Sequence, residues 1–151
     1  MKIAIGSDHA GFDLKKDLIE HLKSQGHDVQ DFGAPNAEPS DYPKYALPVA
    51  ESVADKRYDR GILICGNGIG MSIVSNKVPG IRAALVTTEK MAKDTRQHND
   101  SNILVLAGRD LPEDQNVKIA DVWLSTAFSN LDRHARRVEE IKEIEKEIYK
   151  S

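Results

Sequence analysis

The sequence predicts an α/β domain in which helices cover both faces of a five-stranded, mainly parallel sheet. Apolar runs of strand length alternate with segments of helical periodicity from end to end. Strands that alternate with helices typically form βαβ units, and these units build parallel sheets. The 151 residues contain no internal repeat, low-complexity tract or linker. We therefore expect one three-layer α/β/α domain over residues 1–151.

The first half of the chain supplies three strands and two full helices. The strands are expected over residues 3–6, 27–32 and 61–65. Apolar residues at helical spacing predict a helix over residues 13–24, and Gly26 suits its end. Three prolines mark residues 33–43 as a loop, which leads into a helix over residues 45–56.

The second half continues the alternation of strands and helices. Strands are expected over residues 81–86 and 103–107, and helices from Met71 and over residues 88–98, 113–128 and 133–150. Thr87 or Thr88 is placed to cap the helix that follows it. The last helix carries an apolar stripe, made of Val138, Ile141, Ile144 and Ile148. Such a stripe requires a partner, so we expect this helix to contact the sheet or a second subunit.

The ends of the predicted strands form a shortlist of ligand-binding segments. Parallel α/β sheets bind ligands beside the carboxyl ends of their strands. Residues 7–9, 65–70 and 108–110 follow three of the strands, and we expect them to meet at one edge of the sheet. Asp8 and His9 can orient a ligand hydroxyl or move a proton, although Asp8 also suits the cap of a helix.

Cys65, the only cysteine, ends a buried strand and leads into Gly66-Asn67-Gly68-Ile69-Gly70. Backbone amides and a helix start favour anions, so a thiol at this position ionises more easily than a free thiol. A lone cysteine is more often a small buried hydrophobe. Three glycines in the next five residues favour a base beside an anion cradle, with a plain tight turn as the alternative. The glycine spacing matches neither the dinucleotide fingerprint nor the P-loop.

Basic side chains near two helix ends are further candidates. His98 can exchange a proton with a ligand oxygen, or it can interact with the dipole of its helix. Arg133 and Arg137 are four residues apart and share one helix face. Two guanidinium groups on one face suit a phosphate dianion, and a solvated basic patch is the alternative.

Composition excludes several classes of protein. The formal charge of -3 lacks the basic excess of a nucleic-acid-binding protein. The apolar runs are too short for a membrane span. The lone cysteine and the absence of a signal peptide's apolar region favour a cytoplasmic protein. The five histidines show no metal-binding spacing, so we expect no metal site.

Six short segments carry a resemblance that covers nearly the whole chain. They are Gly6-Ser7-Asp8-His9-Ala10-Gly11, Asp41-Tyr42-Pro43, Ile64-Cys65-Gly66-Asn67-Gly68-Ile69-Gly70, Asn76-Lys77-Val78-Pro79-Gly80-Ile81-Arg82, Arg96-Gln97-His98-Asn99 and Arg133-His134-Ala135-Arg136-Arg137-Val138. Jointly they resemble the type B ribose-5-phosphate isomerases, a family shared with the galactose-6-phosphate isomerase subunits. The resemblance implies a Rossmann-like fold and an aldose–ketose isomerase that acts on a phosphosugar without metal or cofactor. It also implies a homodimer or dimer of dimers, because a second subunit completes the pocket in this family.

The resemblance also implies a role for each matching residue. Cys65 is the base that moves a proton between C1 and C2, and His98 opens the sugar ring with Asn99 nearby. The amides of Gly66, Asn67, Gly68, Ile69 and Gly70 hold the enediolate oxygen. Asp8 and His9 bind the sugar, and Tyr42 lines the pocket. Arg109, Arg133 and Arg137 bind the phosphate.

Two positions place the chain within the family and leave its substrate open. One branch of the family replaces the cysteine with a glutamate at the position of Met71, so this chain resembles the cysteine branch. Asn67 stands where the family usually has a threonine or serine hydroxyl that carries protons between substrate oxygens, and an amide carries protons poorly. D-ribose 5-phosphate is the expected substrate. Another phosphosugar (allose or galactose 6-phosphate, or a tetrulose phosphate) and a non-catalytic phosphosugar-binding module are the alternatives.

Overall fold

The computed structural model describes residues 1–150 and contains one parallel sheet. Its strands are β1 (Lys2–Ser7), β2 (Asp28–Asp31), β3 (Arg60–Cys65), β4 (Ala83–Leu85) and β5 (Ile103–Ala107). They lie in the order β2-β1-β3-β5-β4, and every neighbouring pair is parallel. The carboxyl ends of all five strands therefore lie at one edge of the sheet, and their amino ends lie at the other.

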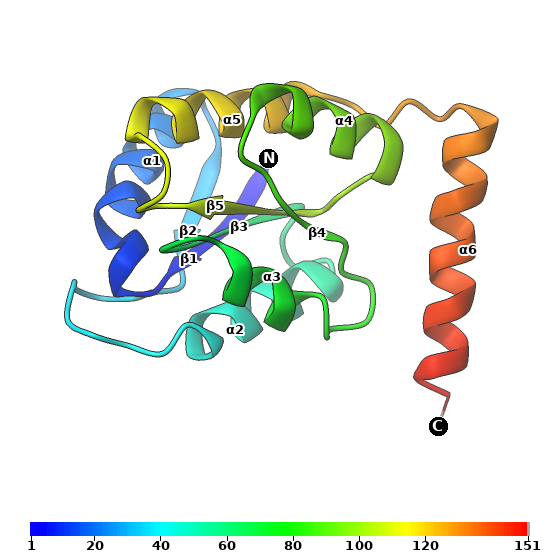
Figure 1. The fold of residues 1–151 in the computed structure, drawn as a ribbon, viewed down its shortest axis with the longest axis horizontal. Coiled ribbons are helices and arrows are strands. Elements are labelled where there is room, and N and C mark those ends of the chain that lie inside the picture. The colour runs from blue at the N-terminus through cyan, green and yellow to red at the C-terminus, as the bar shows by residue number, and fades with distance from the viewer. Residues whose placement is uncertain (151) are drawn as a thin grey trace.

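Helices cover both faces of the sheet (Figure 1). The helices α1 (Phe12–Ser24), α4 (Glu89–Asn99) and α5 (Glu113–Ser125) lie on one face, and α2 (Pro43–Ala54) and α3 (Ile69–Ser75) lie on the other. A short 3-10 turn, η1 (His9–Gly11), connects β1 to α1. The predicted three-layer α/β/α fold with five strands is thus confirmed.

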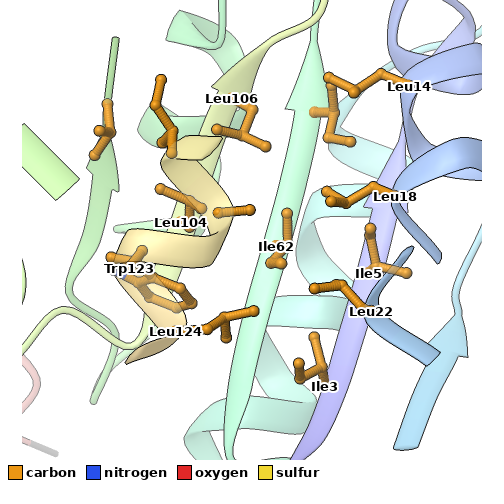
Figure 2. Packing of buried hydrophobic residues seen from close by; sticks show 14 of the residues in the cluster. Ile3, Ile5, Leu14, Leu18, Leu22, Ile62, Leu104, Leu106, Trp123 and Leu124 are labelled. Atoms are coloured by element: carbon orange, nitrogen blue, oxygen red, sulfur yellow. The ribbon is translucent and has the colours of Figure 1, made fainter. Parts of the chain in front are cut away.

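Alternation along the strands divides the core into two clusters. In β3, Ile62 and Ile64 belong to the cluster beneath α1 and α5, whereas Leu63 and Cys65 belong to the cluster beneath α2 and α3. Figure 2 shows the first cluster, in which leucines of α1 and Trp123 of α5 surround the strand side chains. Burial of each large apolar side chain contributes about 1.5–3 kcal/mol, which fixes the sheet against both layers.

The limits of the helices follow from local hydrogen bonds. Thr88, rather than Thr87, caps α4, because its side chain accepts a hydrogen bond from the amide of Met91 at 3.1 Å. The predicted helix over residues 113–128 ends earlier, at Ser125. Thr126 has extended backbone angles, and its carbonyl accepts a hydrogen bond from Arg96 Nε at 3.1 Å. That buried arginine on α4 replaces the helical bond that would have continued α5.

The helix α6 (Asp132–Ile148) stands beside the edge strand β4 and outside the two helical layers (Figure 1). Within residues 1–150, two polar contacts connect the far half of α6 and the residue after it to the domain: Glu145 Oε1 accepts from the amide of Gly80 at 2.7 Å, and the Tyr149 hydroxyl donates to the carbonyl of Lys77 at 2.7 Å. Val138 is buried, but Ile141, Ile144 and Ile148 are 44%, 59% and 68% exposed. Most of the apolar stripe is therefore uncovered in a single chain. No helix within residues 1–150 has both the length and the apolar character needed to cross a membrane.

Candidate active site

The segments that follow β1, β3 and β5 meet at the carboxyl edge of the sheet. The amide of Asp8 donates to the carbonyl of Ile64 at 3.3 Å, and the amide of Gly108 donates to that of Cys65 at 2.8 Å. Register places Cys65 opposite Ala107, at the last pair of the β3–β5 ladder. Cys65 is thus flanked by the Asp8 segment on one side and by the Gly108 segment on the other.

The Cys65 side chain is 5% exposed and lies on the face covered by α2 and α3. It belongs to the same apolar cluster as Met71, in the first turns of the next helix. A cysteine side chain packs as a small apolar group with a weak S–H donor, so this cluster can hold it without a hydrogen-bond partner. The polar groups around it come from the turn that follows, which starts at the next residue.

The glycine turn holds backbone amides with no partner. Those of Asn67, Gly68, Gly70 and Met71 donate no hydrogen bond to any group of residues 1–150. Gly68 has φ +82, and a methyl group there would lie 2.4 Å from Leu85 Cδ1, so only glycine fits. The turn therefore presents free N–H groups, as an anion or oxyanion requires.

Asn67 uses its side chain to stabilise the turn. Its Oδ1 accepts a hydrogen bond from the amide of Ile69 at 3.0 Å. The amide of Ile69, which we predicted to bind the substrate oxygen, is therefore already satisfied within the chain. The Nδ2 group of Asn67 has no partner among the described residues, so the side chain can still donate a hydrogen bond to a ligand.

Asp8 and His9 are both held in place by their neighbours. Asp8 Oδ1 accepts hydrogen bonds from the amides of Ala10 at 2.9 Å and Gly11 at 3.3 Å, so Asp8 caps the 3-10 turn η1. The Asp8 Oδ2 atom makes no hydrogen bond within the described residues, which leaves one oxygen for a ligand. His9 is bound by Ser40: its Nδ1 lies 3.1 Å from the Ser40 amide nitrogen and 3.2 Å from the Ser40 carbonyl oxygen, and its own amide donates to Ser40 Oγ at 3.2 Å. These contacts with Ser40 fix the orientation of the His9 ring.

Tyr42 and Arg109 border the same edge. Tyr42 packs on the glycine turn so closely that a methyl group at Gly70 would lie 2.6 Å from its Cζ. The amide of Arg109 donates to the carbonyl of Gly66 at 3.0 Å, and its exposed side chain passes over that glycine. The carboxyl-edge group thus consists of Asp8, His9, Tyr42, Cys65, the turn 66–70 and Arg109.

The remaining predicted residues gather elsewhere, between the end of α4 and the start of α6. His98, Asn99, Arg133 and Arg137 line a hollow of about 410 Å³ together with His134, Val138 and Ile141. We call the first four residues the amino-edge group. Arg133 and Arg137 project from one face of α6, as their spacing predicts, and both are exposed.

Within one chain, the two groups lie at opposite edges of the sheet. Arg82, which precedes β4, donates from Nε to the carbonyl of Asn99 at 3.0 Å, so the end of α4 lies at the amino ends of the strands. Cys65 lies level with Ala107, and β5 rises about 13 Å from Ile103 to that residue. Cys65 and His98 of one chain therefore cannot contact the same sugar. Arg109 is likewise separated from Arg133 and Arg137.

Comparisons with known proteins identify the family. The family model described as Ribose/Galactose Isomerase matches residues 3–141. The chain belongs to this family. It is 44% identical to ribose-5-phosphate isomerase B of Escherichia coli, over 95% of this chain and 96% of that protein. The predicted family and the predicted isomerase class are therefore confirmed.

Solved structures of the family agree with the fold. The structure of Clostridium thermocellum ribose-5-phosphate isomerase B matches with a TM-score of 0.95 at 51% identity, over 98% of this chain and 99% of that one. That of the Mycoplasma genitalium ribose-5-phosphate isomerase B, which contains bound ribulose-5-phosphate, matches with a TM-score of 0.93 at 43% identity, over 97% of each chain. A phosphosugar ligand is thus documented for a relative with the same fold.

Two features of the site in this family member escaped sequence reasoning. Ser40, which holds His9, lies in a loop whose shape no periodicity specifies. His134, which is buried against His98 with ring centroids 4.5 Å apart, appears in the sequence analysis only within the last of the six resembling segments. Its position in the sequence could have identified it, because His134 lies between Arg133 and Arg137, the two candidate phosphate ligands on the same helix. Among residues 1–150, no three His, Cys, Asp or Glu side chains are placed to hold a metal ion.

Proposed function

We propose that the chain interconverts D-ribose 5-phosphate and D-ribulose 5-phosphate, with Cys65 as the base. The observation that carries the proposal is the position of this thiol, at the end of β3 and directly before a turn with unpartnered amides. Base and oxyanion donors are the two components that removal of a proton beside a carbonyl requires. The relatives named as ribose-5-phosphate isomerases support the choice of sugar.

The reaction proceeds by two proton transfers at carbon. The Cys65 thiolate removes the proton from C2 of the open-chain aldose, and the C2–H electrons form the C1–C2 double bond of an enediolate. The charge that develops on the oxygen is stabilised by the free amides of Gly68 and Gly70. Cys65 then returns a proton to C1, while the C2 hydroxyl proton moves to the C1 oxygen. Asn67 donates a hydrogen bond from Nδ2 but does not carry that proton.

Two of the three predicted phosphate-binding residues, Arg133 and Arg137, and the ring-opening residue His98 come from a second protomer, whereas Arg109 lies beside Cys65. The separation of the carboxyl-edge and amino-edge groups in one chain supports this arrangement, because a single sugar phosphate must contact both. The uncovered apolar residues of α6 supply a surface that a second copy would bury. In a twofold dimer, each protomer then contributes one half of each of two sites.

The substitution Cys65→Ala tests the proposal. It removes the base and leaves the amides in place, so kcat is expected to fall by about 10³-fold, within the range for general bases. Affinity for D-ribulose 5-phosphate, measured by calorimetry, should change little. A non-catalytic binding module would instead show ligand binding and no turnover in the unsubstituted protein. Turnover by the variant within tenfold of the original would exclude Cys65 as the base.

The identity of the sugar requires a separate assay, since Asn67 supplies an amide where a hydroxyl was expected. A panel of aldose phosphates with four, five and six carbons, each at several concentrations, measures kcat/KM for each chain length. The five-carbon substrate is expected to give the highest value. A higher value for a six-carbon or four-carbon phosphosugar would keep the chemistry and change the substrate.

A further inference from the structure

A second imidazole lies against the predicted ring-opening residue. The rings of His98, at the end of α4, and His134, in the first turn of α6, have centroids 4.5 Å apart and planes inclined by 39°. His98 is exposed, whereas His134 is only 6% exposed. The proposed mechanism assigns no task to this buried ring.

Ser129 fixes the orientation of the His134 ring. Its Oγ accepts a hydrogen bond from the amide of Leu131 at 3.2 Å, which leaves the hydroxyl proton free for another acceptor. His134 Nδ1 lies 2.7 Å from that oxygen and can accept this proton. The amide of Ser129 also donates to the carbonyl of Gln97 at 3.2 Å, at the residue before His98. The loop between α5 and α6 thus connects both rings to the end of α4.

Burial and the surrounding positive charges disfavour a proton on His134. Burial lowers the pKa of His134 below its ordinary value, and the positive charges of Arg133, His98 and Arg137 lower it further. A neutral ring packed on His98 places no additional positive charge beside it. His98 is the exposed imidazole of this pair and the one that a ligand in the hollow can contact.

We propose that His134 is a positioning residue, which holds the His98 imidazole in the orientation that opening of the sugar ring requires. His98 ends a helix, and without a neighbour its side chain would sample several rotamers. Ring opening breaks the C1–O4 bond, removes a proton from the C1 hydroxyl and adds one to O4, so the imidazole must be aligned with the ring oxygens. The inference rests on the proposed isomerase function.

An experiment can separate ring opening from proton transfer at carbon. D-ribose 5-phosphate is a cyclic sugar in solution, whereas D-ribulose 5-phosphate is open-chain because its O5 carries the phosphate. In D₂O, exchange of a C1 hydrogen of ribulose 5-phosphate, followed by NMR, reports the action of Cys65 without any ring chemistry. Conversion of ribose 5-phosphate to ribulose 5-phosphate requires ring chemistry as well.

The variants are His134→Ala, His134→Phe and Ser129→Ala, with His21→Asn and Ser24→Ala as matched controls outside the site. His134→Ala is expected to lower kcat on ribose 5-phosphate by about 10–100-fold, part of the range for a general acid–base group. Ser129→Ala, which loses the hydrogen bond to His134 and the acceptor for the Leu131 amide but keeps the imidazole, should lower it by about three- to tenfold. The rate of C1 hydrogen exchange should stay within about twofold in every variant, as should both activities in the controls.

Each outcome has a defined meaning. Equal loss of conversion and exchange would show that His134 supports the whole site and would overturn the proposal, as would unchanged conversion in His134→Ala. If that variant does not fold, as judged by circular dichroism, His134→Phe decides, because it keeps the ring and loses the bond to Ser129. Absence of both reactions in the unsubstituted protein would contradict the proposed function rather than the role of His134.

Discussion

The two edges of the sheet are built in different ways. At the carboxyl edge, backbone hydrogen bonds between the segments after β1, β3 and β5 hold Cys65 and the glycine turn, and a close contact seats Tyr42 on Gly70. At the amino edge, Arg133 and Arg137 project from an exposed face of α6, a helix that lies outside the two layers. The first edge is suited to a reaction that needs fixed geometry, and the second to binding of a charged group.

This difference is the basis of the proposed division of the site between two protomers. Proton transfer at carbon tolerates little displacement, so its base and oxyanion donors belong to one rigid unit. Phosphate binding is less demanding, because two arginine side chains on an exposed helix face can reach a phosphate and bind it through several hydrogen bonds. A site assembled from both edges can combine these properties only when a second copy brings its α6 to the first.

Removal of one arginine tests the amino edge with the largest expected effect. Arg137→Ala should raise KM for ribose 5-phosphate by about 10–100-fold, since hydrogen bonds to charged groups contribute roughly 1.5–3 kcal/mol. KM for unphosphorylated ribose should change little. Arg136→Ala is the matched control, because Arg136 lines a different hollow with Glu139, Glu140 and Glu143. Equal effects of Arg137→Ala on both sugars would remove the phosphate-binding role.

A pair of glycine substitutions tests the rigidity of the carboxyl edge. Gly68 and Gly26 have similar positive φ angles, +82 and +88, so alanine at either position should lower the free energy of unfolding by about 1–2 kcal/mol. A methyl group at Gly26 meets nothing within 4 Å, whereas one at Gly68 meets Leu85. Only Gly68→Ala should therefore also lower kcat, by about tenfold or more. Equal kcat in the two variants would argue that the turn need not be rigid.

The smallest expected effect concerns pH and the buried ring of the amino edge. The pKa of His134 in the folded chain lies below its ordinary value of 6.5, so the unfolded chain binds this proton more readily. Protonation of His134 therefore does not reduce the free energy of unfolding above about pH 6.5, and it reduces this free energy progressively as the pH drops below that value. His134→Phe should flatten the decline of Tm between pH 7 and pH 5. Burial and the N-terminal charge also lower the pKa of His27, so His27→Asn should flatten it independently. Identical profiles of Tm against pH for His134→Phe and the unsubstituted protein would contradict a lowered pKa of His134.

Much of this comparison could be predicted from the sequence. Continuous apolar runs such as residues 61–65 are typical of buried parallel strands, so the strands could be predicted. The glycines after Cys65 predict a tight turn, because glycine adopts backbone angles that other residues avoid. The limit of α5 at Ser125 could not be predicted, since it depends on Arg96, 30 residues away. Contacts such as Ser40 with His9 likewise join segments 31 residues apart through loop shape.

The separation of the predicted site residues between two edges of the sheet could also not be predicted from the sequence. The sequence places His98 at the end of a helix, but it does not show that the end of this helix is bound by Arg82, the residue before β4, and so lies at the amino edge. The expected subunit contact of α6 remains a prediction, and the exposed Ile141, Ile144 and Ile148 are its physical basis.

Mixing two inactive variants tests the shared site most directly. Cys65→Ala disables one half-site and His98→Ala disables the other, so each homodimer should be nearly inactive. If protomers share sites, subunit exchange in an equal mixture creates heterodimers that each contain one intact site. The activity should then recover to about one quarter of the original, because half of the dimers are mixed and each has one of two sites. No recovery after verified exchange of subunits would place the complete site within one chain and contradict the account.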